Sequence, residues 1–283
     1  MSLDQFYTRP EFSEEYVGQV LERWRDPDVL FVEPSAGTGA FAHPLLGAGR
    51  KVFAIDMDPR TSDIVRSDFL LFDLSPYKDN HSAIVVVGNP PFGKNACTAV
   101  RFFNHAARHA DEIAFIVPRT FRKLSLQKRL DKMFHLSHDE DVGNQAFIRF
   151  GNSHDVPCAW QIWTKRKISR PVPIPPSVDH LIIYTTPANA CFAMRRVGFY
   201  TGRIITENFT SLSKSTHYFI RELADGVVDA LRTVDWTAIA AQTAGSRSLS
   251  KAEIAFKLNE AYYSRSIRQS EDRQSVPPDD KGT

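Results

Sequence analysis

The stretch Ala83-Ile84-Val85-Val86-Val87-Gly88-Asn89-Pro90-Pro91-Phe92 decides the fold. Its short, unbroken run of Ile and Val is typical of a strand that is buried on both faces, as in a parallel sheet. The tetrapeptide Asn89, Pro90, Pro91 and Phe92 then lies at the carboxyl end of that strand, where open α/β sheets place their ligands. Two prolines fix φ and remove two backbone donors. The sequence therefore predicts a stiff loop that presents the Asn89 side chain, a free carbonyl and an aromatic ring.

These groups suit the transfer of a methyl group to an aromatic amine, whose nitrogen is a poor nucleophile because its lone pair is delocalised into the ring. The Asn89 side-chain oxygen and a backbone carbonyl can accept the two N–H hydrogens and localise that lone pair. Phe92 is placed to stack on the base. A strand-ending turn without chemistry is the alternative interpretation.

A glycine loop upstream predicts a cofactor site on the same sheet. Residues 28–33 predict the first strand, and Gly37 and Gly39 then let a ligand approach the backbone before a helix begins. This strand, glycine turn and helix open the nucleotide-binding half of a doubly wound sheet. Asp56 ends the second predicted strand, residues 51–55, where an acidic residue commonly binds ribose hydroxyls. The third glycine of the dinucleotide fingerprint is missing.

Asp68 and Phe69 are placed to bracket an adenine, with the carboxylate on its amino group and the ring on its face. A helix cap or turn residue is the alternative for Asp68. Further strands are expected at residues 113–117, 134–142 and 157–163.

The combined motifs resemble the class I S-adenosylmethionine-dependent N6-adenine methyltransferases over roughly residues 4 to 164. The residues that carry the resemblance are Phe6-Tyr7-Thr8, Glu33-Pro34-Ser35-Ala36-Gly37-Thr38-Gly39-Ala40-Phe41, Asp56, Asp68-Phe69 and Asn89-Pro90-Pro91-Phe92. The opening Asp4-Gln5-Phe6-Tyr7-Thr8 is similar to that of phage- and virus-type enzymes. The resemblance implies an α/β fold: a doubly wound, Rossmann-like mixed sheet of seven strands, the last two forming an antiparallel hairpin, with a small C-terminal domain.

The resemblance also implies roles for single residues and S-adenosyl-L-methionine as the cofactor, with no metal. Tyr7 and Thr8 would line its methionine end, Asp56 would bind the ribose, and Asp68 and Phe69 the adenine. The residues expected beneath the methionine and ribose are Glu33, Ser35, Gly37 and Gly39. Asn89, which also belongs to the cofactor set, would bind the target amine together with the Pro90 carbonyl, and Phe92 would stack on the target base.

Substrate contacts are expected in two places within this first region. A basic segment follows the strand at 113–117, and its candidates for phosphate contact are Arg119, Arg122 and Lys123. A solvated helix face is the alternative. In the resembling family an aromatic residue of the loop at 143–155 stacks on the other face of the base. Phe147 is the first candidate and Phe150 its rival, with ordinary core packing as the alternative.

The chain divides into four predicted parts: a catalytic domain at 1–168, a proline-rich linker at 169–177, a small substrate-recognition domain at 178–263 and a disordered tail at 264–283. Basic and aromatic residues alternate in the third part, as is typical of nucleic-acid contact. Its candidates are Arg195, Arg196, Lys214 and His217. A structural extension of the catalytic sheet is the alternative.

Composition narrows the function classes. A hydrophobic share of 42% is that of a globular protein, and a net charge of +2 says little about nucleic acid. No apolar run has membrane-spanning length and no signal peptide is recognised, so we expect a cytoplasmic protein without a membrane partner. Three widely spaced cysteines match no zinc pattern.

The sequence therefore predicts an enzyme that methylates adenine N6 in nucleic acid, with DNA ahead of RNA, in a restriction or phage context. The alternatives are an adenine methyltransferase acting on RNA, a methyltransferase acting on a protein glutamine amide, and a cofactor-binding module without activity.

Overall fold

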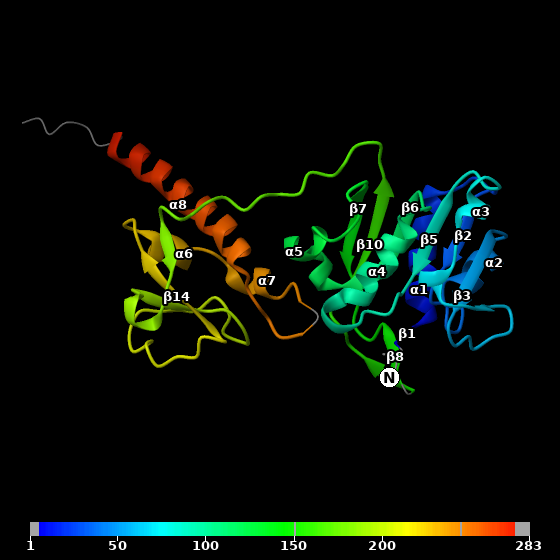
Figure 1. Cartoon of the computed structure of the whole chain (residues 1–283), viewed down its shortest axis with the longest axis horizontal. Helices are drawn as coiled ribbons and strands as arrows, with labels where there is room; N and C mark the ends of the chain where they lie inside the picture. The colour runs from blue at the N-terminus through cyan, green and yellow to red at the C-terminus, as the bar shows by residue number, and fades with distance from the viewer. Residues whose placement is uncertain (1–5, 150, 244, 275–283) are drawn as a thin grey trace, which may run out of the picture. The chain divides into compact units, whose positions relative to one another are not determined.

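Strand β5 (Ile84–Gly88) lies in the middle of a seven-stranded sheet in the computed structural model (Figure 1). Ile84 and Val86 face one hydrophobic cluster and Val85 and Val87 face another, so the strand is buried on both sides, as its apolar run predicts. The structure describes residues 6–149, 151–243 and 245–274. The chain divides into two units, Met1–Val172 and Pro173–Thr283.

The first unit contains the predicted doubly wound mixed sheet. The strand order is β4 (Val65–Arg66), β3 (Lys51–Asp56), β2 (Leu30–Glu33), β5, β6 (Glu112–Pro118), β10 (Cys158–Lys165) and β7 (Phe134–Asp141). The first five strands are parallel, whereas β10 is antiparallel to both of its neighbours. The predicted hairpin of the last two strands is therefore confirmed.

Helices cover both faces of this sheet (Figure 1). Tyr16, Val17 and Val20 of α1 pack on one face, and Ala99, Val100 and Phe103 of α4 pack on the other. The helices of this unit are α1 (Pro10–Arg23), α2 (Ala42–Gly47), α3 (Ser75–Lys78), α4 (Cys97–Ala106) and α5 (Leu124–Gln127), with short 3-10 helices η1 (Phe69–Leu71), η2 (Lys94–Ala96) and η3 (Arg119–Arg122).

A small second sheet joins the start of the chain to the segment between β7 and β10. It consists of β1 (Tyr7–Thr8), β8 (Phe147–Arg149) and β9 (Asn152–His154). All of its pairs are antiparallel, and Thr8 lies opposite Phe147. Part of the predicted loop at 143–155 is thus a β-hairpin that pairs with β1. Asp4 and Gln5 of the sequence motif lie outside the described residues.

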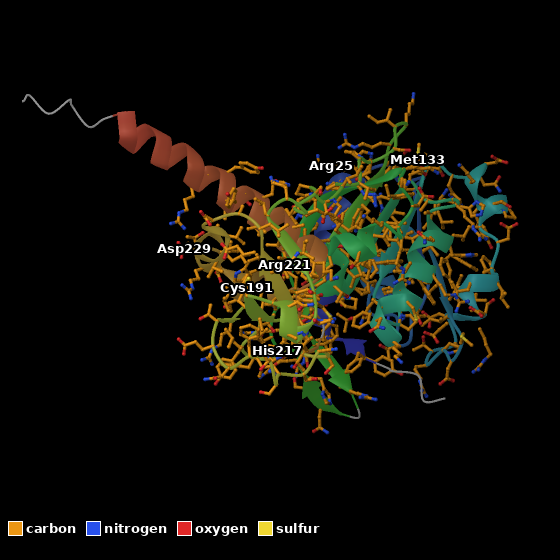
Figure 2. The ribbon with its side chains drawn as sticks, turned by 60° about the vertical axis from the view of Figure 1, so that its left-hand side comes forward. Arg25, Met133, Cys191, His217, Arg221 and Asp229 are labelled. Atoms are coloured by element: carbon orange, nitrogen blue, oxygen red, sulfur yellow. The ribbon has the colours of Figure 1, made fainter. Side chains whose placement is uncertain are left out.

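The second unit is a four-stranded antiparallel sheet with helices. The strand order is β11 (Ile182–Tyr184), β14 (His217–Glu222), β12 (Phe192–Arg195) and β13 (Ile204–Ile205). The helices are η4 (Pro187–Asn189), α6 (Val227–Arg232), α7 (Trp236–Ala240) and α8 (Lys251–Gln274). A separate apolar core joins the sheet to α6 and α8. His217 and Arg221 lie toward opposite ends of β14 (Figure 2).

The ends of the second unit differ from the sequence prediction. Residues 264–274 continue helix α8, where the sequence predicted disorder, and residues 275–283 lie outside the described residues. The boundary between the two units falls between Val172 and Pro173, inside the linker predicted at 169–177. Arg170, at the start of that linker, still belongs to the first unit. Its guanidinium donates to the Gln127 carbonyl at 2.9 Å and lies over the Trp163 ring. Within the described residues, no helix is long and apolar enough to span a membrane.

Candidate functional site

The first unit holds a pocket at the carboxyl ends of β2, β3 and β5, which is where a doubly wound sheet places its ligands. Strand β1, the glycine loop after β2, the segment after β3 and the loop after β5 form its wall. The lining residues are Phe6, Tyr7, Thr8, Glu33, Ser35, Ala36, Gly37, Thr38, Ala40, Phe41, Asp56, Met57, Asp58, Asn89, Pro90, Pro91, Phe92 and Phe102.

The orientation of the Asn89 side chain is set by strand β1. Its amide Nδ2 donates to the Phe6 carbonyl and to the Thr8 hydroxyl, each at 3.2 Å. Both amide hydrogens are therefore used, and the amide oxygen Oδ1 accepts no hydrogen bond from the described residues. The backbone carbonyl of Asn89 accepts from the Ser35 hydroxyl at 3.1 Å, which ties the two loops together. The side chain can act only as an acceptor toward a ligand.

The glycine loop requires glycine at position 37. Gly37 has a φ of +53°, and a Cβ atom there would lie 2.8 Å from the Tyr7 ring. Its N–H donates to the Asp56 carboxylate at 2.7 Å, and the other oxygen of that carboxylate accepts from the Asp58 N–H at 2.7 Å. The carboxylate oxygens keep lone pairs for further donors. Asp56 thus fixes the loop and lines the pocket at once.

Glu33 is a buried acid in the floor of this site. It is 2% exposed and accepts hydrogen bonds from the backbone N–H groups of Ala42, at 2.7 Å, and Phe41, at 3.4 Å, where α2 begins. Burial raises the pKa of Glu33 to about 8, although the two backbone donors favour its ionised form. The side chain therefore holds a proton at neutral pH while it joins β2 to α2.

The loop that contains Phe92 closes on the start of α4. The Phe92 carbonyl accepts from the Thr98 and Ala99 N–H groups at 3.1 and 3.3 Å. Between them, Asn95 and Ala96 adopt left-handed φ values of 53° and 58°, a strained conformation for residues other than glycine. The Phe92 ring is partly buried and reaches both hydrophobic clusters of the sheet.

Three predicted cofactor residues do not line the pocket. Asp68 caps η1, where its carboxylate accepts from the Leu70 N–H at 2.9 Å, so the alternative role as a cap describes it. Phe69 is 1% exposed and packs against Phe102 with ring centroids 5.4 Å apart. Gly39 has a φ of +81° and lies in the same loop as Gly37, but it is not one of the residues that line the pocket.

The structure contradicts the stacking role predicted for Phe147. Its side chain is 1% exposed, and its ring meets the Phe6 ring edge-on at 6.3 Å. No face is free for a base, so the alternative of core packing describes it. Of the two rings in contact, Phe6 lines the pocket and Phe147 packs behind it. The rival Phe150 lies outside the described residues.

The arginines of the basic segment pair with strand β7. Arg122 contacts Asp139 at 2.8 Å and also Asp141, and Arg119 contacts Asp141 at 3.0 Å. Only 19% of the Arg122 side chain is exposed. These partners correct the prediction of phosphate contact for both arginines, because the groups already neutralise carboxylates. Lys123 is half-buried between η3 and α5.

The four candidates in the second unit also have separate surroundings. His217 is 4% exposed, its ring lies 3.3 Å from the Ser213 carbonyl, and burial lowers its pKa. Arg195 donates to the Val197 carbonyl at 2.8 Å, and Arg196 lies 4.8 Å from the centre of the Tyr218 ring. Lys214 is exposed. The buried ring of His217 therefore packs within the unit, whereas Arg195 is half-buried and substrate contact by the three basic residues stays a prediction.

The pocket contains residues that the sequence prediction missed. Met57 and Asp58 follow Asp56 directly. A second acid two residues after Asp56 was a signal from which Asp58 could have been predicted as a pocket residue. Phe102 lies on the buried side of α4, where helical spacing indicates only core packing.

A scan of the sequence against protein-family models found no match, and a search of curated proteins found none.

Solved structures with similar folds include three methyltransferases. A protein of Pyrococcus horikoshii assigned as an RNA methyltransferase has 17% identity and a TM-score of 0.42, over 58% of this chain and 88% of that one. A type I restriction-modification methyltransferase subunit of Streptococcus thermophilus has 15% identity and a TM-score of 0.42, over 58% of this chain and 45% of that one. The magnesium protoporphyrin IX methyltransferase of Synechocystis has 13% identity and a TM-score of 0.42, over 56% and 79%.

Proposed function

We propose that this chain transfers a methyl group from S-adenosyl-L-methionine to the exocyclic N6 nitrogen of adenine in DNA. The observation that carries the proposal is the orientation of Asn89, whose amide hydrogens are both used by β1 while Oδ1 remains an acceptor beside the pocket. An acceptor fixed in this way suits an amine that must give up the delocalisation of its lone pair.

The residues of the pocket fit the proposed cofactor. Asp56 offers carboxylate lone pairs for ribose hydroxyls, with Asp58 beside it. Gly37 leaves the backbone bare next to the Tyr7 ring, so a ligand can approach the loop closely. The cofactor supplies the electrophilic methyl group. Tyr7, Thr8, Glu33 and Ser35 complete the binding surface in this proposal.

The chain's own groups then act on the target amine. Asn89 Oδ1 and the Pro90 carbonyl accept its two N–H hydrogens, which directs the lone pair away from the ring plane. The new N–C bond would form as the bond between the methyl group and the cofactor's sulfur breaks. The target nitrogen would then be positively charged, and both oxygens would stabilise that charge until one proton leaves for solvent. Phe92 stacks on the base and holds it in the pocket; in a duplex the base must first be flipped out.

Tritiated-methyl transfer tests the proposal, with duplex DNA, single-stranded DNA, RNA and protein offered in parallel. We expect label in DNA and, after digestion, in N6-methyladenine. Asn89→Ala provides the inactive control. Asn80→Ala is matched to it, because Asn80 is exposed and only donates to the Pro76 carbonyl at 2.9 Å.

Each arm of that assay identifies a competing function. Label in RNA alone indicates the RNA enzyme, and label in protein indicates a glutamine amide as the acceptor. Absence of label from every substrate, with the cofactor still bound in calorimetry, indicates a binding module and refutes the proposal.

A further inference from the structure

The loop between β12 and β13 in the second unit exposes two adjacent aromatic side chains. Phe199 is 77% exposed and Tyr200 is 63% exposed, and their rings meet at 88° with centroids 5.2 Å apart. Large aromatic groups gain most from burial, so a pair that remains in water is costly unless a partner covers it.

This loop is held rigidly although its aromatic rings are exposed. The Gly198 N–H donates to the Arg247 carbonyl at 2.9 Å, and the Gly202 N–H donates to the Arg195 carbonyl at 2.8 Å. Thr201 is 7% exposed, and its hydroxyl donates to the Gly198 carbonyl. Gly202 has a φ of +97° and lies so close to Trp236 that a Cβ would meet it at 2.2 Å. The backbone is therefore fixed on both sides of the two rings, and little ordering remains to oppose binding.

The charged residue that contacts this aromatic pair is an arginine, and the acids nearest in sequence, Glu207, Asp235 and Glu253, lie just outside the two segments that build the loop. The Arg247 guanidinium lies 5.5 Å from the centre of the Phe199 ring, and Arg203 is exposed at the end of the loop. The two segments that build the site, residues 192–206 and 236–252, contain no Asp or Glu. Aromatic faces among arginines and without carboxylates are the chemistry of proteins that bind unpaired nucleic-acid bases.

We propose that Phe199 and Tyr200 stack on unpaired bases of the DNA substrate, while Arg203 and Arg247 contact the adjoining phosphates. This rests on the proposed function for its substrate and adds a second contact with it, on a unit separate from the pocket. A protein partner fits this surface less well. The loop has no carboxylates that could pair with basic groups of a protein, whereas its arginines can pair with the phosphates of DNA.

Fluorescence anisotropy of the full chain with labelled single-stranded DNA tests this contact. Phe199→Ala and Tyr200→Ala should each weaken binding roughly tenfold, since a stacked base loses its platform. Tyr200→Phe keeps the ring and should bind as the wild type does. Tyr263→Ala is the matched control, because Tyr263 is an exposed aromatic of α8, 45% exposed, outside the loop.

An abasic strand of the same length separates stacking from phosphate contact. It should bind weakly, and with the same affinity to wild type and to both alanine variants. If the alanine substitutions reduce the affinity for the abasic strand as much as the affinity for the normal strand, stacking is refuted. Loop-dependent binding that is tighter for RNA than for DNA overturns the choice of DNA.

Cofactor calorimetry and the methyl-transfer assay distinguish this inference from the proposed function. The stacking loop is refuted, and the proposed function is left intact, if the wild-type chain methylates DNA but the alanine variants bind single-stranded DNA as tightly as the wild type does. A wild-type chain that neither binds nor methylates nucleic acid refutes both.

Discussion

Asn89→Ala removes the acceptor that the structure directs to the pocket. Because Oδ1 acts mainly as the target nitrogen becomes charged, we expect kcat to fall about 10²- to 10³-fold while the dissociation constants of cofactor and DNA change little. Single-turnover methylation at saturating cofactor measures this. A variant that methylates adenine at a near-normal rate shows that the loop has another role.

Thr8 is a positioning residue for Asn89 in this view, since its hydroxyl accepts one of the two amide hydrogens at 3.2 Å. Thr8→Val keeps the volume and removes the acceptor, which should lower kcat roughly tenfold, the value of about one hydrogen bond. Thr8→Ser should restore it. If Thr8 instead serves the cofactor alone, Thr8→Val raises the cofactor dissociation constant and leaves kcat unchanged.

Glu33 makes stability depend on pH. Its folded pKa of about 8 lies above the ordinary value of 4.5, so the folded chain keeps a proton that the unfolded chain releases between these values. The free energy of unfolding should therefore fall as pH rises through this window, by at most about 1.4 kcal/mol per pH unit. Urea unfolding from pH 5 to 8 measures the slope. Glu33→Gln should flatten it, and an unchanged slope in that variant shows that other groups titrate.

Residue identity alone predicted that the Asn89 loop lies at the pocket, but it did not predict the surroundings of several other residues. Asn89 and Asp56 follow apolar runs whose strand character is unmistakable, so their place at one sheet edge could be predicted. Asp68 and Phe69 do not line the pocket, because in this chain the acid caps η1 and the aromatic residue next to it packs in the core. Nothing in the local sequence separates these uses.

At the scale of elements, α1 is attached to the sheet by an ion pair between an exposed arginine and a buried carboxylate. Arg23 Nη2 lies 2.7 Å from Glu112 Oε2, and Glu112 on β6 is 1% exposed. The Trp24 indole N–H and the Thr164 hydroxyl donate to the same carboxylate at 2.7 and 2.9 Å. The charge of Glu112 is thus matched by one cation and supported by two neutral donors.

Arg23→Met leaves that carboxylate buried without its cation. The expected cost is about 3–5 kcal/mol of unfolding free energy, because an uncompensated charge remains in the core. Denaturant unfolding measures it. Arg25→Met is the control, since Arg25 is an exposed arginine two residues beyond the end of α1 (Figure 2), and it should change little. Equal stability of the two variants shows that the pair contributes nothing.

The basic segment shows why elements read in isolation mislead. The residues from 119 to 132 suggested phosphate binding, but two of them, Arg119 and Arg122, pair with Asp139 and Asp141 on the next strand. Strand β1 illustrates the same difficulty, because its partner β8 is far along the chain and two residues give no strand pattern. The large strands themselves, in contrast, could be placed from their apolar runs, and the mixed sheet of seven strands was implied by the resemblance to the class I methyltransferases.

At the scale of the whole molecule, each unit has its own core. A chain that ends at Val172 should therefore fold and bind S-adenosyl-L-methionine with an affinity near that of the full chain. It should bind single-stranded DNA at least tenfold more weakly, because it lacks the stacking loop. Calorimetry and anisotropy measure the two constants. Loss of cofactor binding with loss of cooperative unfolding shows that the units depend on one another.

The pairing of β1 with β8 also sets the moment at which the Asn89 loop of a newly made chain can take its final geometry. The ribosome releases Tyr7 and Thr8 early, but their partners Phe147–Arg149 follow only after strands β2 to β7. Until then β1 has no strand to pair with, and the amide of Asn89 has no fixed acceptors. The loop after β5 therefore reaches its final geometry only after residues 147–149 have been made, so folding of this part of the first unit cannot finish during synthesis of the first five large strands.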